Sequence, residues 1–202
     1  MSRIVVLGAG ESGAGAAVLA KVKGFDTFVS DMSAIKDKYK ELLNKHGIAW
    51  EEGQHTEELI LNADEVVKSP GIPNDAPLIL KLKEKGISII SEIEFAGRYT
   101  NAKMICITGS NGKTTTTTLT GEIMKAHFGE EKTFVVGNIG NPYTLEVTKT
   151  SKDSVTVGEI SSFQLETIHT FHPVVSAILN IIPEISQEDV LRLRYCSPPI
   201  TS

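Results

Sequence analysis

Lys113 and Thr114 follow a glycine-bearing loop that separates a short apolar run from a helix-like segment. The run covers residues 104–108, and the loop and the start of the helix read Gly-Ser-Asn-Gly-Lys-Thr-Thr over 109–115. Bare glycine backbone lets several N–H groups converge on phosphate oxygens, and a helix N-terminus favours the same anion. Lys113 would pair with the outer phosphates of a nucleotide, and the Thr114 hydroxyl would help to hold Mg²⁺.

This loop departs from the usual Gly-x-x-x-x-Gly-Lys-[Ser/Thr] spacing, because position 107 is Ile rather than Gly. We interpret it as a shorter variant of the phosphate-binding loop, since a strand-like run precedes it and a helix-like segment follows. The residues expected to bind the nucleotide are Gly109, Ser110, Asn111, Gly112, Lys113, Thr114 and Thr115.

A second glycine loop, Gly-Ala-Gly-Glu-Ser-Gly over 8–13, follows the first apolar run, and Asp31 ends the next one. This context favours a dinucleotide or a nucleotide-sugar, with NAD or a purely structural turn as alternatives. Glu11 is unfavourable beside a pyrophosphate unless its carboxylate points away. The turn from Ser69 to Gly71 follows what we read as the third strand and is either a rigid turn or a ligand contact.

Glu159 ends another strand-like run and is followed by Ser161 and Gln164. A carboxylate at that position can complete a Mg²⁺ shell, whereas an isolated Glu at a strand end is usually solvated. The polar neighbours favour the metal interpretation. Asn138, in a separate Gly-Asn-Ile-Gly turn, could contact substrate.

Composition gives an ordinary globular protein of 202 residues with a net charge of −5. The acidic balance argues against a nucleic-acid binder. Cys106 and Cys196 are too far apart in the sequence to suggest a metal site or a disulfide framework. The first residues lack the apolar segment and the small-residue cleavage site of a signal peptide, and no run reaches the ~18 apolar residues of a membrane span. We therefore expect a cytoplasmic protein that does not bind membranes.

Short β-branched runs alternate with helix-like segments, which predicts an α/β fold with parallel sheets. We expect an N-terminal Rossmann-like doubly wound sheet over 1–95 and an incomplete P-loop ATPase α/β domain over 96–181. Residues 182–202, which include a short possible helix over 187–193, have no place in either sheet. The predicted strands cover 4–7, 25–30, 65–68, 87–90, 104–108, 134–137, 154–158 and 174–179. An Ala-rich segment over 14–23 is the first predicted helix.

In combination, these motifs resemble the Mur ligases over about residues 1–181. The family shares the short phosphate loop, the Asn-Ile-Gly turn at 138–140 and the segment 159–166, in this order. The glycine loop at 8–13 and the segment 92–95 point to the branch that adds D-glutamate to UDP-N-acetylmuramoyl-L-alanine in peptidoglycan synthesis.

The resemblance implies roles for named residues. Glu11, Ser12 and Gly13 would lie by the pyrophosphate of the UDP-sugar, with Asp31 and Gly71 near the uracil. ATP would bind the second domain. There Lys113 would grip the γ-phosphate, and Thr114 and Glu159 would position Mg²⁺. Asn138, Ser161 and Gln164 would face the substrate carboxylate, which ATP converts to an acyl phosphate before the amine of D-glutamate attacks.

Departures from the family follow residue 181. The expected Asp- and His-rich segment, the modified lysine and the amino-acid-binding third domain are missing, so we expect 182–202 to be non-family sequence and the chain to be an inactive, truncated product. We further expect a monomer. A sister Mur ligase adding another amino acid and a non-catalytic nucleotide- or NAD-binding module remain as alternatives.

Overall fold

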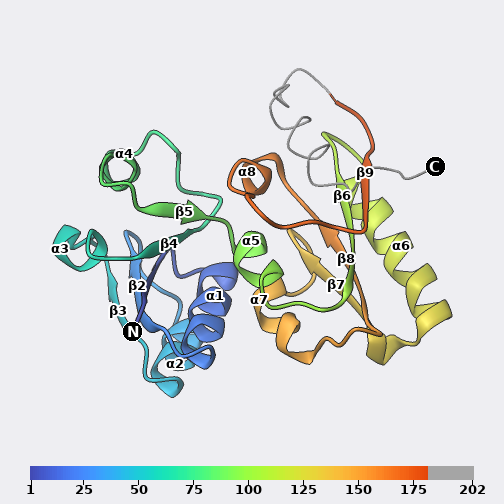
Figure 1. Ribbon diagram of the computed structural model, residues 1–202, viewed down its shortest axis with the longest axis horizontal. Coiled ribbons are helices and arrows are strands. Elements are labelled where there is room, and N and C mark those ends of the chain that lie inside the picture. The colour runs from blue at the N-terminus through green and yellow to red at the C-terminus, as the bar shows by residue number, and fades with distance from the viewer. Residues whose placement is uncertain (182–202) are drawn as a thin grey trace. The chain divides into compact units, whose positions relative to one another are not determined.

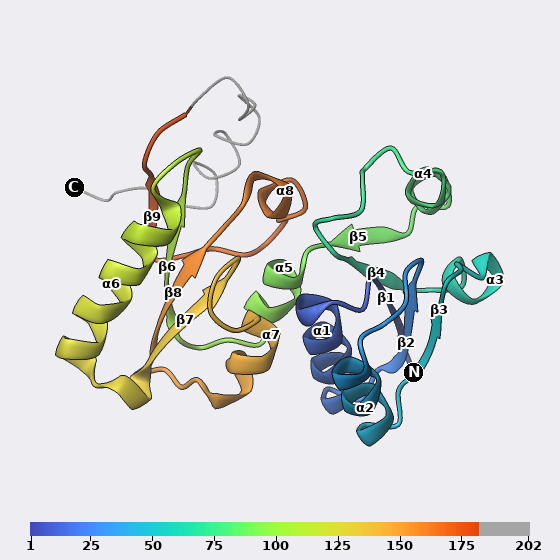
Figure 2. The same cartoon turned by 180° about the vertical axis from the view of Figure 1, so that it is seen from behind.

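The computed structural model describes residues 1–181 (Figures 1 and 2). The tail at 182–202, including the helix expected over 187–193, lies outside the described residues. The chain divides into two compact units, Met1–Phe95 and a second that begins at Ala96. Each unit is a parallel β-sheet with helices, so the predicted α/β class is confirmed.

The first unit has a five-stranded parallel sheet in the order β3-β2-β1-β4-β5. Its strands are β1 (Arg3–Leu7), β2 (Asp26–Asp31), β3 (Ala49–Glu52), β4 (Glu65–Lys68) and β5 (Ser88–Ile90). The chain starts at the centre, moves outward to β3 and returns to the other side of β1 at β4. The strand order therefore reverses between β1 and β4, where open α/β sheets place their ligands.

Helices cover both faces of this sheet. They are α1 (Glu11–Val22), α2 (Asp37–Lys45), α3 (Glu57–Ile60) and α4 (Pro77–Glu84). The helix α5 (Glu92–Gly97) follows β5 and ends in the second unit. Buried side chains from α3 and α4 pack with Val5 and Leu7, which point to the same face of β1. Val6, the residue between them, approaches the start of α1 on the opposite face. This arrangement confirms the doubly wound prediction.

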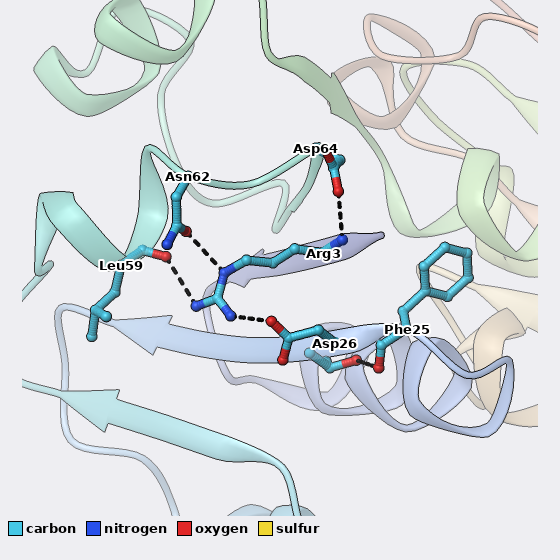
Figure 3. A network of polar contacts seen from close by, with 7 residues as sticks. Arg3, Phe25, Asp26, Leu59, Asn62 and Asp64 are labelled. Carbon is cyan, nitrogen blue, oxygen red and sulfur yellow. Dashed lines mark hydrogen bonds and ion pairs between the residues drawn. The ribbon is translucent and has the colours of Figure 1, made fainter. Parts of the chain in front are cut away.

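Arg3 ties together the amino ends of β1, β2 and β4 (Figure 3). Its guanidinium forms an ion pair with Asp26, and Nε donates to Asn62 Oδ1 at 2.8 Å. Its backbone N–H donates to Asp64 Oδ2 at 2.6 Å. These contacts lie at the edge opposite the glycine loop, so they fix the strand ends without occupying the carboxyl edge.

Two local predictions for this unit were wrong. The strand β3 was not expected, because Ala-Trp-Glu-Glu is short and polar, as suits an edge strand that pairs only with β2. The turn at Ser69 consequently follows the fourth strand rather than the third. The helix α1 was expected to begin at Ala14 but begins at Glu11, inside the glycine motif.

The second unit has a four-stranded parallel sheet in the order β7-β8-β6-β9. Its strands are β6 (Lys103–Thr108), β7 (Thr133–Gly137), β8 (Val155–Glu159) and β9 (Val175–Ile178). Its helices are α6 (Lys113–Phe128), α7 (Tyr143–Glu146) and α8 (Ser162–Leu165), with 3₁₀ turns η1 (Glu130–Lys132) and η2 (Val147–Lys149). Met124 and Phe128 of α6 pack on Ile107, Val155 and Val157 of the central strands.

Candidate functional site

The loop from Gly109 to Thr114, termed here the glycine–lysine loop, joins the central strand β6 to helix α6. Gly109 has φ +144° and Gly112 has φ +82°, values that L side chains rarely adopt. Gly112 is the N-cap of α6, and Lys113 is the first helical residue. The two glycines therefore let the chain turn sharply from the sheet, so that the first backbone N–H groups of α6 lie at the loop.

Lys113 folds back over this loop. Its ammonium donates to the carbonyl oxygens of Gly109 at 2.6 Å and Ser110 at 3.1 Å. A cation next to a helix N-terminus combines two positive fields, those of the ammonium and of the helix dipole. The loop is thus locally positive in a chain whose net charge is −5.

Glu159, at the end of β8, is 1% exposed. Its Oε2 accepts a hydrogen bond from Thr114 Oγ1 at 2.8 Å, and its Oε1 accepts one from Asn138 Nδ2 at 2.8 Å. Within residues 1–181, no lysine or arginine pairs with it. A buried carboxylate without a protein cation is costly unless a metal ion or another positive group neutralises it.

Asn138 is fixed against Glu159 by the turn at 137–140. Its backbone N–H donates to the Glu159 carbonyl at 2.9 Å, in addition to the side-chain contact. A Cβ on Gly137 would lie 2.3 Å from that same carbonyl oxygen, so only glycine permits this close approach. In the structure the side-chain amide of Asn138 donates to the Glu159 carboxylate, and the substrate contact suggested by the sequence stays a prediction.

Ser161 and Gln164 form a capping box at the start of α8. Ser161 N–H donates to Gln164 Oε1 at 2.9 Å, and Gln164 N–H donates to Ser161 Oγ at 3.4 Å. The Gln164 side chain is buried. Both residues lie just beyond Glu159 in the chain, but the atoms that we expected to meet a substrate carboxylate bond to each other.

Asn180 is a residue of this site that sequence reasoning missed. It follows β9 and bonds to the backbone of Asn111 at the tip of the glycine–lysine loop. The two residues are 69 positions apart in the chain. The only local signal was its position just after an apolar strand, at the same edge of the sheet.

In the first unit, Gly8 and Gly13 bring α1 directly against β1. Gly8 has φ +90°, and a Cβ on Gly13 would lie 1.8 Å from the Gly8 carbonyl oxygen. Glu11, Ser12 and Gly13 therefore form the first turn of α1 rather than an open loop. The backbone N–H groups of this turn are at the carboxyl edge of the sheet, as a pyrophosphate contact requires.

Asp31 braces this glycine loop in the structure. Its Oδ2 accepts a hydrogen bond from Ala9 N–H at 2.6 Å, and its Oδ1 accepts one from Ser33 N–H at 2.8 Å. Each carboxylate oxygen thus has a backbone donor. The sequence suggested a ligand contact for this side chain, and here it holds the loop.

The turn at Ser69 and Gly71 lies beside Gly8, where the strand order reverses. Ser69 N–H donates to the Leu7 carbonyl at 2.9 Å, which extends the β1–β4 pairing by one residue. The Lys68 ammonium donates to the Ile72 carbonyl at 2.6 Å and closes the turn. Gly71 is exposed and a Cβ there would meet nothing within 4 Å.

A further polar cluster at the same edge was not foreseen. Ser30 Oγ donates to Glu51 Oε1 at 2.6 Å and lies 2.7 Å from His55 Nδ1. Burial raises the pKa of Glu51, but hydrogen bonds from Ser30, Thr56 and Gln54 outweigh it and hold this pKa below its ordinary value. The missed strand β3 brings Glu51 beside Ser30.

The fold and these loops define a protein of two parallel α/β units, the second with a lysine-bearing glycine loop. A model of the Mur ligase MurD-like N-terminal domain matches residues 2–91, and a model of the Mur ligase middle domain matches residues 107–188. The second match includes the first residues of the segment 182–202. The two matches cover most of the chain in the family's order, and the chain belongs to the Mur ligase family.

Curated relatives agree with this assignment. The chain is 66% identical over 184 residues to the UDP-N-acetylmuramoylalanine--D-glutamate ligase of Bacteroides thetaiotaomicron, covering 91% of this chain and 41% of that protein. It is 52% identical over 182 residues to the ligase of the same name from Porphyromonas gingivalis, covering 90% of this chain and 40% of that protein. The chain thus spans about two fifths of the length of these relatives.

Solved structures support the fold. UDP-N-acetylmuramate:L-alanyl-gamma-D-glutamyl-meso-diaminopimelate ligase from Neisseria meningitides aligns with a TM-score of 0.60 at 16% identity, over 98% of this chain and 69% of that one. The murein peptide ligase mpl from Psychrobacter arcticus gives 0.58 at 19% identity, over 98% and 47%. Within residues 1–181, no helix is both long and apolar enough to cross a membrane.

Proposed function

We propose that this chain carries the nucleotide-binding part of an ATP-dependent ligase that joins D-glutamate to UDP-N-acetylmuramoyl-L-alanine in peptidoglycan synthesis. The curated relatives carry the name of that activity, and they match at 51–67% identity. One observation carries the proposal: a buried carboxylate, Glu159, bonds to the hydroxyl of Thr114 directly beside Lys113 at a helix N-terminus.

The glycine–lysine loop is where ATP would bind. The N-terminal N–H groups of α6 would donate to phosphate oxygens, and the Lys113 ammonium would leave its two carbonyl partners to meet the γ-phosphate. Gly109 to Thr115 would thus form the triphosphate site.

The residues present also fit Mg²⁺. Mg²⁺ is usually held by one or two carboxylates together with substrate phosphates and water, and here Glu159 and Thr114 supply one carboxylate and one hydroxyl. No cluster of three or more His, Cys, Asp or Glu occurs in residues 1–181, which agrees with a site completed by the nucleotide. When bound, the ion would neutralise phosphate charge during phosphoryl transfer. Asn138 would hold the Glu159 carboxylate in place.

The first unit would bind the UDP-sugar at the switch point of its sheet. The first turn of α1, with Glu11, Ser12 and Gly13, would meet the pyrophosphate, and the turn from Ser69 to Gly71 together with Asp31 would border the uracil. Asp31 would act through Ala9 and Ser33, which it already binds.

The chemistry would begin when the substrate carboxylate attacks the γ-phosphorus of ATP and displaces ADP. The amine of D-glutamate would then attack the resulting acyl phosphate and release inorganic phosphate. Two anions must approach each other in the first step, so the positive charge of Lys113 and the α6 amides lowers its barrier. Ser161 and Gln164 would border the substrate carboxylate through the capped start of α8. We place this reaction in the cytoplasm, with the chain as a monomer.

The test is MgATP binding to the 202-residue chain and to its Lys113→Ala variant. Losing a charge-assisted contact to phosphate should weaken binding on the order of 100-fold. Lys132→Ala, which removes an exposed lysine of η1, is the matched control and should bind as the wild type does. Unchanged MgATP affinity in folded Lys113→Ala would refute the proposal, and NAD affinity without ATP affinity would favour a nucleotide-sensing module.

A further inference from the structure

Asn180 makes a two-point contact with the tip of the glycine–lysine loop. Its Oδ1 accepts a hydrogen bond from Asn111 N–H at 2.9 Å, and its Nδ2 donates to the Asn111 carbonyl at 2.9 Å. Its own carbonyl accepts a bond from Ser110 N–H at 3.2 Å. We call this set of three hydrogen bonds the Asn180 clamp.

Sheet pairing places Asn180 at the loop. Strand β9 runs parallel to β6, with Ile178 opposite Thr108, and Leu179 N–H extends the ladder to the Thr108 carbonyl at 3.0 Å. The next residue along β9 therefore lies beside the first residue of the loop. A Cβ on Gly109 would be only 3.2 Å from the backbone N and O of Asn180, so glycine permits this approach.

The clamp divides the backbone donors of the loop into two groups. Ser110 and Asn111 N–H groups point to Asn180, so they are not directed at an anion. The N–H groups of Lys113, Thr114 and Thr115 belong to the first turn of α6, where helix geometry provides no intrahelical acceptor. The donors that remain for phosphate are those at the helix start.

We propose that Asn180 is a positioning residue for nucleotide binding, which holds the loop tip so that the α6 amides and Lys113 face the phosphates. Its side-chain amide pairs with the backbone N–H and the backbone carbonyl of the same residue, Asn111, which fixes both the place and the orientation of that residue. An ordered loop has less conformational entropy to lose when it closes on a ligand. This role rests on the proposed ATP site at the same loop.

The experiment compares wild type, Asn180→Ala and Lys113→Ala by amide hydrogen exchange without ligand and by MgATP titration. In Asn180→Ala, the Asn111 amide should exchange about tenfold faster or more, because its acceptor is gone. MgATP affinity should fall about tenfold, the equivalent of roughly one net hydrogen bond. Lys113→Ala should lose affinity while the Asn111 amide stays protected.

Asn101→Ala, an exposed asparagine of the same unit, is the matched control and should change neither quantity. Asn180 is itself exposed, so its truncation should leave the thermal unfolding midpoint near that of the wild type. Faster exchange with unchanged MgATP affinity would overturn the positioning role, and so would unchanged exchange. If the wild-type chain did not bind MgATP, both the proposed ATP site and the role of Asn180 would be overturned. The titration of the wild type alone would show this outcome.

Discussion

The two glycine loops share a backbone plan but carry opposite charge. Each follows a central parallel strand, each begins with a glycine of positive φ, and each leads into a helix at the carboxyl edge of its sheet. The first helical residue is Glu11 in the first unit and Lys113 in the second. The same geometry therefore presents a negative side chain in one unit and a positive one in the other.

The side chains that hold the two loops also differ in charge, and the more negative one is again in the first unit. The carboxylate of Asp31 holds Ala9 in the first loop, whereas the neutral amide of Asn180 holds Asn111 in the second. Backbone amides alone can bind a pyrophosphate, but a triphosphate carries more charge and needs a cation. In both loops the glycines shape the backbone, and under the proposed function the neighbouring side chains would select the anion.

Of the substitutions considered for the two loops, Gly13→Ala should cause the largest loss of folding stability. The added Cβ would lie 1.8 Å from the Gly8 carbonyl oxygen, and backbone cannot move aside cheaply. We expect a loss of about 3 kcal/mol in the unfolding free energy of the first unit. Denaturant titration followed by tryptophan fluorescence reports this unit, because the single tryptophan, Trp50, lies in β3.

Gly10→Ala is the control within the same motif. A Cβ there would meet nothing within 4 Å, and φ is −69°, so the change should stay within about 0.5 kcal/mol. If Gly13→Ala and Gly10→Ala were equally stable, the folding of α1 would not depend on the close approach of Gly13 to the Gly8 carbonyl.

Glu159→Gln should weaken the Mg²⁺ dependence of ATP binding that we propose for the second loop. The neutral side chain keeps a hydrogen-bond acceptor but loses the charge that a hard cation prefers. We expect the Mg²⁺-dependent gain in ATP affinity to fall about tenfold, comparable to losing one ligand interaction. Titrations with and without Mg²⁺ measure it.

The folded state should not suffer from that change, since a buried unpaired charge is removed. Glu130→Gln, at an exposed position of η1, serves as the control and should retain the full Mg²⁺ effect. An undiminished Mg²⁺ effect in Glu159→Gln would move the metal site away from this carboxylate.

Glu11→Gln should reduce the charge difference between the two loops, and it should have the smallest effect on binding affinity. Removing a negative charge from a helix N-terminus stabilises a bound anion there by roughly 0.3–1 kcal/mol. We expect UDP to bind about two- to fourfold more tightly, as measured by calorimetric titration at low salt. Glu58→Gln, in the first turn of α3, should leave UDP affinity unchanged, and weaker UDP binding to Glu11→Gln would contradict the comparison.

Local patterns were enough to predict most strands. Runs such as Ile4 to Leu7 are apolar without alternation because the strand is buried on both faces, and that signal lies within a few neighbouring residues. The start of α1 was predicted three residues late, because Gly13 has low helix propensity. Its place in the first turn of the helix is explained by the close approach to Gly8, which lies outside the helix. Strand β3 was missed because an exposed edge imposes little hydrophobic pattern.

The sequence by itself determined the parallel α/β class, the two glycine loops and the residues Lys113, Thr114 and Glu159, because strand burial and glycine turns are local properties. Only the tertiary structure decided which side chains serve these loops. It placed Asn180 on Asn111, Asp31 on Ala9 and Asn138 on Glu159. Such pairs join distant segments through the order of strands in a sheet, and no spacing along the chain encodes that order directly.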